Sequence, residues 1–389
     1  MAMINGRKKR SAGRLSTGHR GYGLIGRPGC KLHHDESGNM LDDYTITALD
    51  PEMLERVQGE IDIKTKPPGS LGRVESLALH IGAIQKTLKP TVDPARLFLF
   101  AGDHGMVAEG VSAWPSEVTT LMLLNFLAGG AAANVFARAN NVAITVVDAG
   151  IAGDLPPEFA NHPDLVRANI RKGTRNALVE DALTREETEA ALPSAHSLRP
   201  MRSNPEPAPS FLGEMGIGNT ASAALLAHAV EGIDLVSLTG PGAGLDPDGV
   251  TRKAEILKRI AARHPGRLAP VEALSAFGGL EIAMMAGALV GGASAGGIVI
   301  VDGFIATAAA LCALRARPDA ADHVVFAHRS KEPGHRLILD ALDVEPLIDL
   351  DLRLGEGTGG LLAFPILRAA AAMLGEMATF ESAGITAKD

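Results

Sequence analysis

The stretch Leu97-Phe98-Leu99-Phe100-Ala101-Gly102-Asp103-His104 decides the fold class. Four bulky apolar residues in a row are typical of a strand that is buried on both faces, as in a parallel sheet. They lead into a glycine and two ionisable side chains, which predicts a polar loop at the end of the strand. Similar apolar runs, separated by helical stretches, indicate an α/β fold built on a parallel sheet. These runs are residues 143–147, 233–238, 298–301 and 324–326.

Each of these apolar runs leads into polar or glycine residues. In open α/β sheets, ligands bind in the crevice outside the carboxyl ends of the strands. Five such loops on one edge of the sheet therefore predict one large binding site. The loops are residues 101–105, 148–150, 239–242, 302–303 and 327–329.

Helical patterns lie at both ends of the chain. Asp50-Pro51 has the residues of a helix N-cap and a first helical position, and the stretch Leu361–Met377 shows helical spacing of its apolar residues. These helices, one set from each chain end, predict a small helical domain beside the sheet. Its expected bounds are residues 41–90 with 345–389, and the large α/β domain is expected over residues 91–344.

The charge of the chain is divided unevenly. The net charge is −8, but residues 1–40 hold eight Lys or Arg against Asp35 and Glu36, which gives +6 there and −14 elsewhere. Because this segment is also rich in Gly and Ser and has no apolar periodicity, we expect residues 1–40 to be a disordered basic arm. Nucleic-acid binding or targeting stays open for the arm, but a solvated tail or a misplaced start codon is favoured, and we expect no nucleic-acid partner. The whole chain has 44 Gly but only 14 aromatic residues, which disfavours a base-stacking surface for nucleic acid.

Two cysteines, Cys30 and Cys312, are too few for a disulfide framework or a four-ligand zinc site, so we expect a reducing, cytoplasmic setting.

Residues 282–301 form a run of 20 uncharged residues, which is long enough to span a bilayer. Paired glycines interrupt the run, and no aromatic belt follows it. We expect a buried helix, a glycine turn and a strand there, and no membrane contact.

The segment Gly213-Glu214-Met215-Gly216-Ile217-Gly218-Asn219-Thr220 is followed by small residues that predict a helix. A glycine turn that enters a helix presents backbone N–H groups and the positive end of the helix dipole, which suits a phosphate group. A close-packing turn is the alternative. Lys253, which lies in another predicted helix, would supply a cation to the same anion, unless it is a solvated surface lysine.

Glu356 lies between glycines at residues 355–360, where the backbone can approach a ligand closely. A carboxylate in such a place is a candidate general base, and a merely solvated glutamate is the alternative.

Asp103, His104 and His328 are candidates for a metal site or a catalytic triad. No second His or Cys stands at ligand spacing and no Gly-x-Ser-x-Gly motif occurs, so neither is favoured and no metal is expected.

Seven ordered motifs together resemble the nicotinate-nucleotide:dimethylbenzimidazole phosphoribosyltransferase family of cobalamin lower-ligand synthesis. They run in order from about residue 60 to 380, over most of the chain outside the arm. The motifs are residues 66–73, 101–105 with 109–111 and 115–119, 147–151, 213–220, 244–246, 301–305 and 353–359.

The resemblance implies transfer of the phosphoribosyl group of nicotinate mononucleotide to 5,6-dimethylbenzimidazole, which gives α-ribazole 5′-phosphate and nicotinate. It also implies a Rossmann-like large domain, a small helical domain and a homodimer, with no cofactor, and it assigns the general base to Glu356. The chemistry agrees with this assignment. Nicotinate leaves from a cationic pyridinium and needs no general acid, whereas the attacking benzimidazole must lose a proton, so one base is sufficient. Attack opposite the pyridinium inverts the anomeric carbon.

Roles for further residues follow from the same resemblance. The nucleotide and its phosphate would contact Glu214, Met215, Gly216, Gly218, Asn219, Lys253, Asp302 and Gly303. The benzimidazole slot would be shaped by Asp103, His104, Ser112, Trp114 and Pro115, where the chain's single Trp could lie against the flat ring. For Trp114, a place in the core is the alternative.

Residues 193–210 depart from the family pattern. They carry many prolines and no periodicity where a helix and a strand should lead into the phosphate segment, so we expect a loop and a missing strand there. A reading-frame error would explain the same departure. Two other functions therefore stay open: an enzyme of this scaffold that uses a different base, and a non-catalytic protein that binds a base or a nucleotide.

Overall fold

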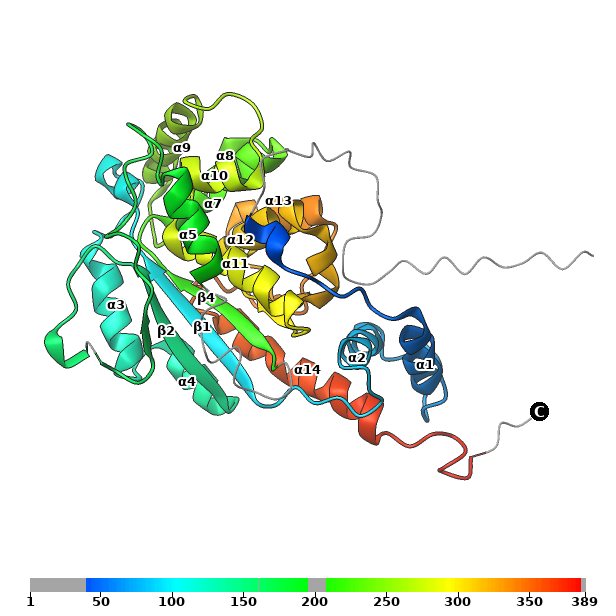
Figure 1. The fold of residues 1–389 in the computed structure, drawn as a ribbon. Coiled ribbons are helices and arrows are strands. Elements are labelled where there is room, and N and C mark those ends of the chain that lie inside the picture. Colours follow the sequence, from blue (N-terminus) through cyan, green and yellow to red (C-terminus); the bar gives the residue numbers. More distant parts are fainter. Residues whose placement is uncertain (1–39, 160, 195–207, 386–389) are drawn as a thin grey trace, which may run out of the picture.

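A computed structural model describes residues 40–159, 161–194 and 208–385 (Figure 1). Its centre is one sheet of six parallel strands in the order β3-β2-β1-β4-β5-β6. The sheet confirms the predicted α/β class. The strands are β1 (Ala95–Gly102), β2 (Val142–Gly150), β3 (Leu165–Arg167), β4 (Ser210–Met215), β5 (Val299–Val301) and β6 (Val324–Phe326).

The central strand β1 is buried on both faces, as its unbroken apolar run predicts. Phe98 and Phe100 pack into one layer of helices, while Leu97 and Leu99 pack into the other. All four side chains are at most 1% exposed. Because side chains alternate along a strand, this single run holds both layers against the sheet.

Helices cover both faces of the sheet. On one face, α11 and α12 contact the strands, and further helices pack behind them. This layer contains α5 (Arg185–Ser194), α7 (Asn219–Glu231), α8 (Leu235–Leu238), α9 (Pro247–Ala261), α10 (Pro270–Phe277), α11 (Leu280–Ser294), α12 (Phe304–Ala316) and α13 (Pro333–Leu342). The other face is covered by α3 (Glu117–Leu127), α4 (Ala132–Ala139) and α14 (Thr358–Glu376). Short 3-10 helices are η1 (Met40–Asp43), η2 (Gly105–Glu109), η3 (Pro157–Phe159) and η4 (Pro318–His323).

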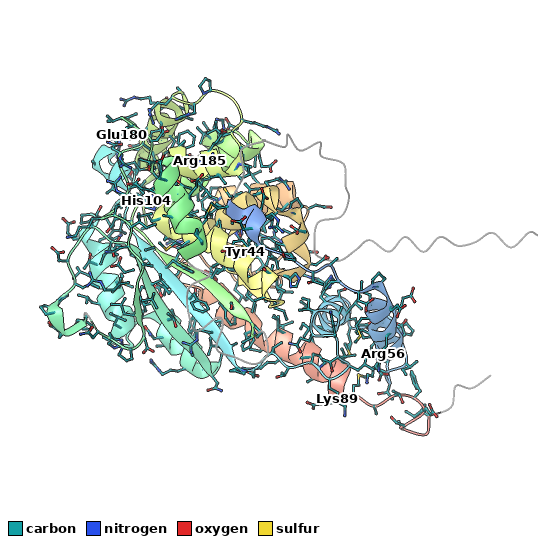
Figure 2. The ribbon with its side chains drawn as sticks, viewed as in Figure 1. Tyr44, Arg56, Lys89, His104, Glu180 and Arg185 are labelled. Atoms are coloured by element: carbon teal, nitrogen blue, oxygen red, sulfur yellow. The ribbon has the colours of Figure 1, made fainter. Side chains whose placement is uncertain are left out.

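Helices from both chain ends lie side by side, as predicted. Figure 1 shows α1 (Pro51–Asp62) and α2 (Arg73–Ile84) beside the far end of α14, which continues from under the sheet. The Asp50 side chain accepts a hydrogen bond from the Glu52 amide, so the predicted N-cap is confirmed. The exact domain bounds stay a prediction. Leu41 and Tyr44 pack instead against the layer that contains α11 and α12. Figure 2 labels Tyr44 there.

Two sequence predictions on the strands are wrong. Residues 233–238 do not form a strand: Asp234 caps the short helix α8, accepting a hydrogen bond from the Ser237 amide at 2.9 Å. The strand beside the phosphate segment is not missing, since β4 runs to Met215 and pairs with both β1 and β5. Residues 193 and 194 end α5 and residue 210 begins β4, while residues 195–207 of the expected loop lie outside the described residues.

The apolar run at residues 282–301 is a buried helix, a turn and strand β5, as predicted. The described residues contain two other helical segments that are long and apolar enough to cross a membrane, Glu117–Ala139 and Thr358–Glu376. In α14, 61% of the apolar window is buried inside the protein, as in a core helix. Packing against the sheet therefore explains part of the apolar character of these segments.

Candidate functional site

A cavity of about 480 Å³ lies at the carboxyl ends of β4, β5 and β6 and extends toward the segment after β1. This volume lies within the range of small-molecule sites, and the position agrees with the rule for open α/β sheets. The lining residues come from six segments. These lie within residues 111–122, 214–220, 241–243, 303–305, 328–332 and 353–356.

Glu356 lines this cavity and is only 4% exposed, so the alternative of a solvated glutamate is wrong. Its Oε2 accepts a hydrogen bond from the Ala133 amide at 3.2 Å. Burial raises the pKa of the Glu356 carboxyl, and the negative charge of Asp302 adds to the effect. A carboxylate with a raised pKa binds a proton more tightly, which suits a general base.

Glu214 lies at the end of β4 and faces the same cavity. Burial raises its pKa to about 8, with further contributions from Asp302 and Glu281. At neutral pH its carboxyl is therefore mostly protonated. The Asn219 side chain donates a hydrogen bond to Oε2 of Glu214, and these two predicted nucleotide ligands thus lie together on the cavity wall.

The predicted phosphate segment enters α7 at the cavity wall. Gly218, the N-cap, has a φ of 94°, and a side chain there would meet Val107 and His104. A side chain at Gly216 would lie 2.4 Å from the carbonyl oxygen of Gly102. The positive end of a 13-residue helix thus meets the cavity, with Gly216, Gly218 and Met215 all among its lining. Close packing therefore requires glycine at residues 216 and 218.

Lys253 does not line the cavity but lies behind its wall. Its Nζ donates hydrogen bonds to Thr220 Oγ1 at 2.8 Å and to the Gly240 carbonyl at 3.3 Å. The side chain is 1% exposed, so the alternative of a solvated surface lysine is wrong. Burial lowers the pKa of Lys253 to about 8, although the negative charge of Glu332 acts to raise it. Lys253 therefore supports Thr220, which does line the cavity.

Asp302 and Gly303 were both predicted to lie along the ribose, but only one of them lines the cavity. Gly303 lines the cavity, whereas Asp302 is 2% exposed and does not. The Asp302 carboxylate accepts hydrogen bonds from the backbone amides of Gly357 and Gly360. Its place is beneath the loop that carries Glu356.

Asp103 and His104 also lie behind the cavity, at the carboxyl end of β1, where Figure 2 labels His104. Asp103 Oδ2 accepts a hydrogen bond from the Ala152 amide at 2.8 Å. His104 Nε2 lies 2.6 Å from Oε1 of Glu281, and both side chains are fully buried. Burial disfavours the charged imidazole, but the charge of Glu281 outweighs it and the pKa of His104 is raised. The geometry places neither predicted residue at the surface of the slot.

Of the three remaining predicted slot residues, two line the cavity. Ser112 and Trp114 are among the lining residues, and Pro115 is not. Trp114 is 53% exposed, so the alternative of a core position is wrong. Its indole N–H donates a hydrogen bond to the Ala243 carbonyl at 3.1 Å. The indole is therefore held across the mouth, and no described contact shows it stacked inside.

Sequence reasoning missed several lining residues. Ser330 and Glu332 follow β6, Arg353 precedes the Glu356 loop, and His328, considered only for a metal or a triad, is also in the wall. Glu332 is 5% exposed and accepts a hydrogen bond from the Gly242 amide at 3.0 Å. For His328, Ser330 and Glu332, the position after the end of β6 was the available signal. Among the lining residues that the structure describes, Arg353 is the only Lys or Arg.

Part of the cavity lining is apolar. Val111, Val118, Met122, Ile305 and Leu354 all contribute to its lining. Apolar side chains can accept a flat aromatic ring, while the glycine backbone and the carboxyl groups can accept polar groups. Among the described residues, no group of three His, Cys, Asp or Glu side chains is placed to hold a metal ion.

Comparison with known proteins agrees with this arrangement. The model of a phosphoribosyltransferase family matches residues 46–385. The nicotinate-nucleotide–dimethylbenzimidazole phosphoribosyltransferase of Aromatoleum aromaticum is 48% identical over 347 residues, covering 88% of this chain and 98% of the relative. The enzyme of that name from Cupriavidus necator is also 48% identical, covering 88% and 97%. The crystal structure of CobT from Thermus thermophilus superimposes with a TM-score of 0.82 at 44% identity, covering 87% of this chain and 100% of that one.

Proposed function

Because the chain belongs to the nicotinate-nucleotide–dimethylbenzimidazole phosphoribosyltransferase family, we propose that the cavity binds nicotinate mononucleotide and 5,6-dimethylbenzimidazole together. The protein is a pentosyltransferase that moves the phosphoribosyl group from the first compound to the second. The observation that carries the catalytic proposal is the position of Glu356. Its buried carboxylate is in the wall of a cavity that also holds an apolar face and the start of α7.

The two substrates are assigned to opposite parts of the cavity by their chemistry. The 5′-phosphate would lie at Gly216–Asn219, where the α7 N-terminus favours an anion. Lys253 would act on it through Thr220. The dimethylbenzimidazole would lie against Val118, Met122 and Leu354, which offer an apolar surface to a flat ring.

Arg353 supplies a positive charge to a cavity that is otherwise rich in carboxyl groups. The substrate brings two anionic groups, the phosphate and the nicotinate carboxylate. The phosphate is assigned to the α7 N-terminus, so Arg353 would face the carboxylate of the nicotinate ring. A guanidinium group is well suited to a planar carboxylate, because it can donate two parallel hydrogen bonds.

The reaction requires the transfer of one proton from the substrate to the protein. A benzimidazole nitrogen attacks the anomeric carbon as the bond to the nicotinate nitrogen breaks, and the electron pair of that bond neutralises the pyridinium. Glu356 takes the proton from the other benzimidazole nitrogen. Attack from the face opposite the departing pyridinium gives the α product. Because Glu356 must be ionised, the rate should fall as the pH drops through its raised pKa.

The test is product formation by the purified protein. Nicotinate should be released from nicotinate mononucleotide only when dimethylbenzimidazole is added, and NMR of the product should show the α anomer. Parallel assays with adenine and with a phenol address a different preferred base. Faster transfer to one of these would change the assigned acceptor, and no nicotinate release with any of the bases would refute the activity.

We further propose that the enzyme is a cytoplasmic homodimer. Leu350, Leu354 and Trp114 are large apolar side chains that are 56%, 57% and 53% exposed. Leu354 and Trp114 both border the cavity, so a second subunit would cover apolar surface there. The single described cysteine, Cys312, is a buried free thiol, which suits a reducing compartment. Light scattering after size exclusion should give twice the chain mass.

A further inference from the structure

We propose that Asp302 is a positioning residue for the general base, holding Glu356 in place through the backbone amides that follow it. The inference rests on the proposed function, because it assigns a task to a residue of the same site. It differs from a role along the ribose, which would require the Asp302 carboxylate to face the cavity. The adjacent Gly303 faces the cavity and Asp302 does not.

Both oxygens of the Asp302 carboxylate accept a hydrogen bond from a backbone amide. Oδ2 accepts a hydrogen bond from the Gly357 amide at 3.1 Å, and Oδ1 accepts one from the Gly360 amide at 2.9 Å. These amides belong to the N-cap and first turn of α14, which have no partners within their own helix. Asp302, 55 residues earlier at the end of β5, thus caps α14 from outside.

The loop before α14 needs such support because its backbone is unusual. Glu356 has a backbone φ of 62°, in the left-handed region that residues other than glycine rarely adopt. Gly355 and Gly357, on either side, have positive φ values as well. A residue held in this conformation persists only when its surroundings fix it. The Gly357 amide, the next along the chain, is one of the two groups that Asp302 holds.

Other contacts also hold this loop. The Glu356 amide donates to the Glu214 carbonyl on β4 at 3.2 Å, and within the loop Thr358 Oγ1 donates to the Gly355 carbonyl at 2.7 Å. A side chain at Gly213 would lie 2.8 Å from the backbone of Glu356 and Gly357, so the loop presses directly on the strand. These contacts fix the loop from the sheet side, while Asp302 fixes the start of the helix.

Asp302 also acts on Glu356 through its charge. Burial is the main reason that the pKa of Glu356 is raised, and the negative charge of Asp302 raises it further. Removal of that charge should therefore lower the pKa of Glu356. The Nε2 atom of His328 lies 3.7 Å from Asp302 Oδ1, and both side chains are buried. The other titratable or charged groups that face this corner are Glu214 on β4, Glu281 on α11, and Glu332 and Arg353 in the cavity wall.

The experiment compares Asp302→Asn with the wild-type enzyme. Asparagine has nearly the same size, but only its oxygen accepts a hydrogen bond, and the charge is gone. The expected kcat is lower by roughly 10- to 100-fold, because the base is displaced from its working geometry. The KM for nicotinate mononucleotide should stay within about twofold of the wild-type value, and the acid limb of the kcat profile should move to lower pH.

Asp148→Asn is the matched control. Asp148 lies near the end of β2, is 1% exposed and accepts a hydrogen bond from the Ile151 amide, but it does not line the cavity. This variant should keep the wild-type acid limb and kcat. If Asp302→Asn does not fold, Asp302→Ser, which keeps one small acceptor, takes its place in the same comparison.

Three outcomes would overturn the inference. One is a KM for the mononucleotide that rises tenfold or more at unchanged kcat, as a ribose ligand requires. Another is a fall in kcat with no movement of the acid limb. The third is failure of both Asp302 variants to bind the mononucleotide. Absence of transfer by the wild-type enzyme would instead refute the proposed function, so the two failures are distinguishable.

Discussion

The indole N–H of Trp114 donates a hydrogen bond to the carbonyl oxygen of Ala243 at 3.1 Å, although the two residues lie 129 positions apart. Trp114 follows η2, and Ala243 lies in the glycine loop between α8 and α9. Both residues line the cavity. The hydrogen bond therefore joins two segments of the cavity wall at its mouth, close to the start of α7.

Trp114→Phe keeps an aromatic ring and removes the N–H donor. A hydrogen bond contributes about 0.5–1.5 kcal/mol net, so loosening of the loop at Ala243 should raise the KM for nicotinate mononucleotide about two- to tenfold. The kcat should change less, because Trp114 is not near Glu356 in any described contact. Steady-state kinetics with the mononucleotide varied would measure this. An unchanged KM would mean that the contact does not order the loop.

Gly218→Ala should damage nucleotide binding. A side chain at this position would lie 2.7 Å from Val107 Cγ2, and the φ of 94° is unfavourable for alanine. The start of α7 must shift, so we expect kcat/KM for the mononucleotide to fall at least about tenfold. Gly266→Ala is the control, because its φ is 97° and nothing lies within 4 Å of the added carbon. Equal kinetic losses in both variants would argue against a phosphate site at Gly218.

Glu214→Gln should change the pH dependence of stability. The Glu214 carboxyl has a pKa of about 8 in the folded protein, raised from 4.5, so the folded state keeps its proton more tightly than the unfolded state does. Stability is therefore lost as the pH rises from about 4.5 to about 8. Glutamine removes this loss. Thermal melts should show a higher Tm for the variant at pH 8 and a smaller difference at pH 5; equal differences would place the Glu214 pKa near normal.

Deletion of residues 1–38 should leave kcat and Tm unchanged, because the family match begins only at residue 46. Extension of the deletion through residue 46 should lower the Tm. Leu41 is 1% exposed, and Tyr44 and Ile46 pack against the same core. Loss of a buried Leu alone costs about 2–5 kcal/mol. A large loss of activity in the shorter deletion would assign the basic arm to the site.

The sequence predicted the fold where apolar runs were continuous. Strands β1, β2, β5 and β6 all follow from such runs, because a strand buried on both faces has no polar side. Strand β4 was missed, since Gly213 and Glu214 interrupt it and resemble part of a glycine loop. The short edge strand β3 (Leu165–Arg167) is only three residues long, which is too few for a periodic signal.

The site was predictable where one segment holds both the glycines and the functional group, as with Glu356 and Gly216. The partners of each group were not predictable. His104 meets Glu281 across 177 positions, and Asp302 meets Gly357 across 55, so only the fold brings them together. For the same reason, the sequence could not tell that Lys253, Asp302 and Asp103 lie behind the cavity wall. Since β4 is present, the missing strand is no longer a reason for suspecting an inactive relative, while residues 195–207 lie outside the described residues.

The most direct test of the account is the turnover of Glu356→Gln with nicotinate mononucleotide and dimethylbenzimidazole. Glutamine keeps the size of the side chain and can still accept a hydrogen bond from the Ala133 amide, but it cannot take a proton. The kcat should fall by roughly 10²–10⁴-fold, while mononucleotide binding, measured by calorimetry, persists. Full turnover in this variant would contradict the assignment of Glu356 as the base.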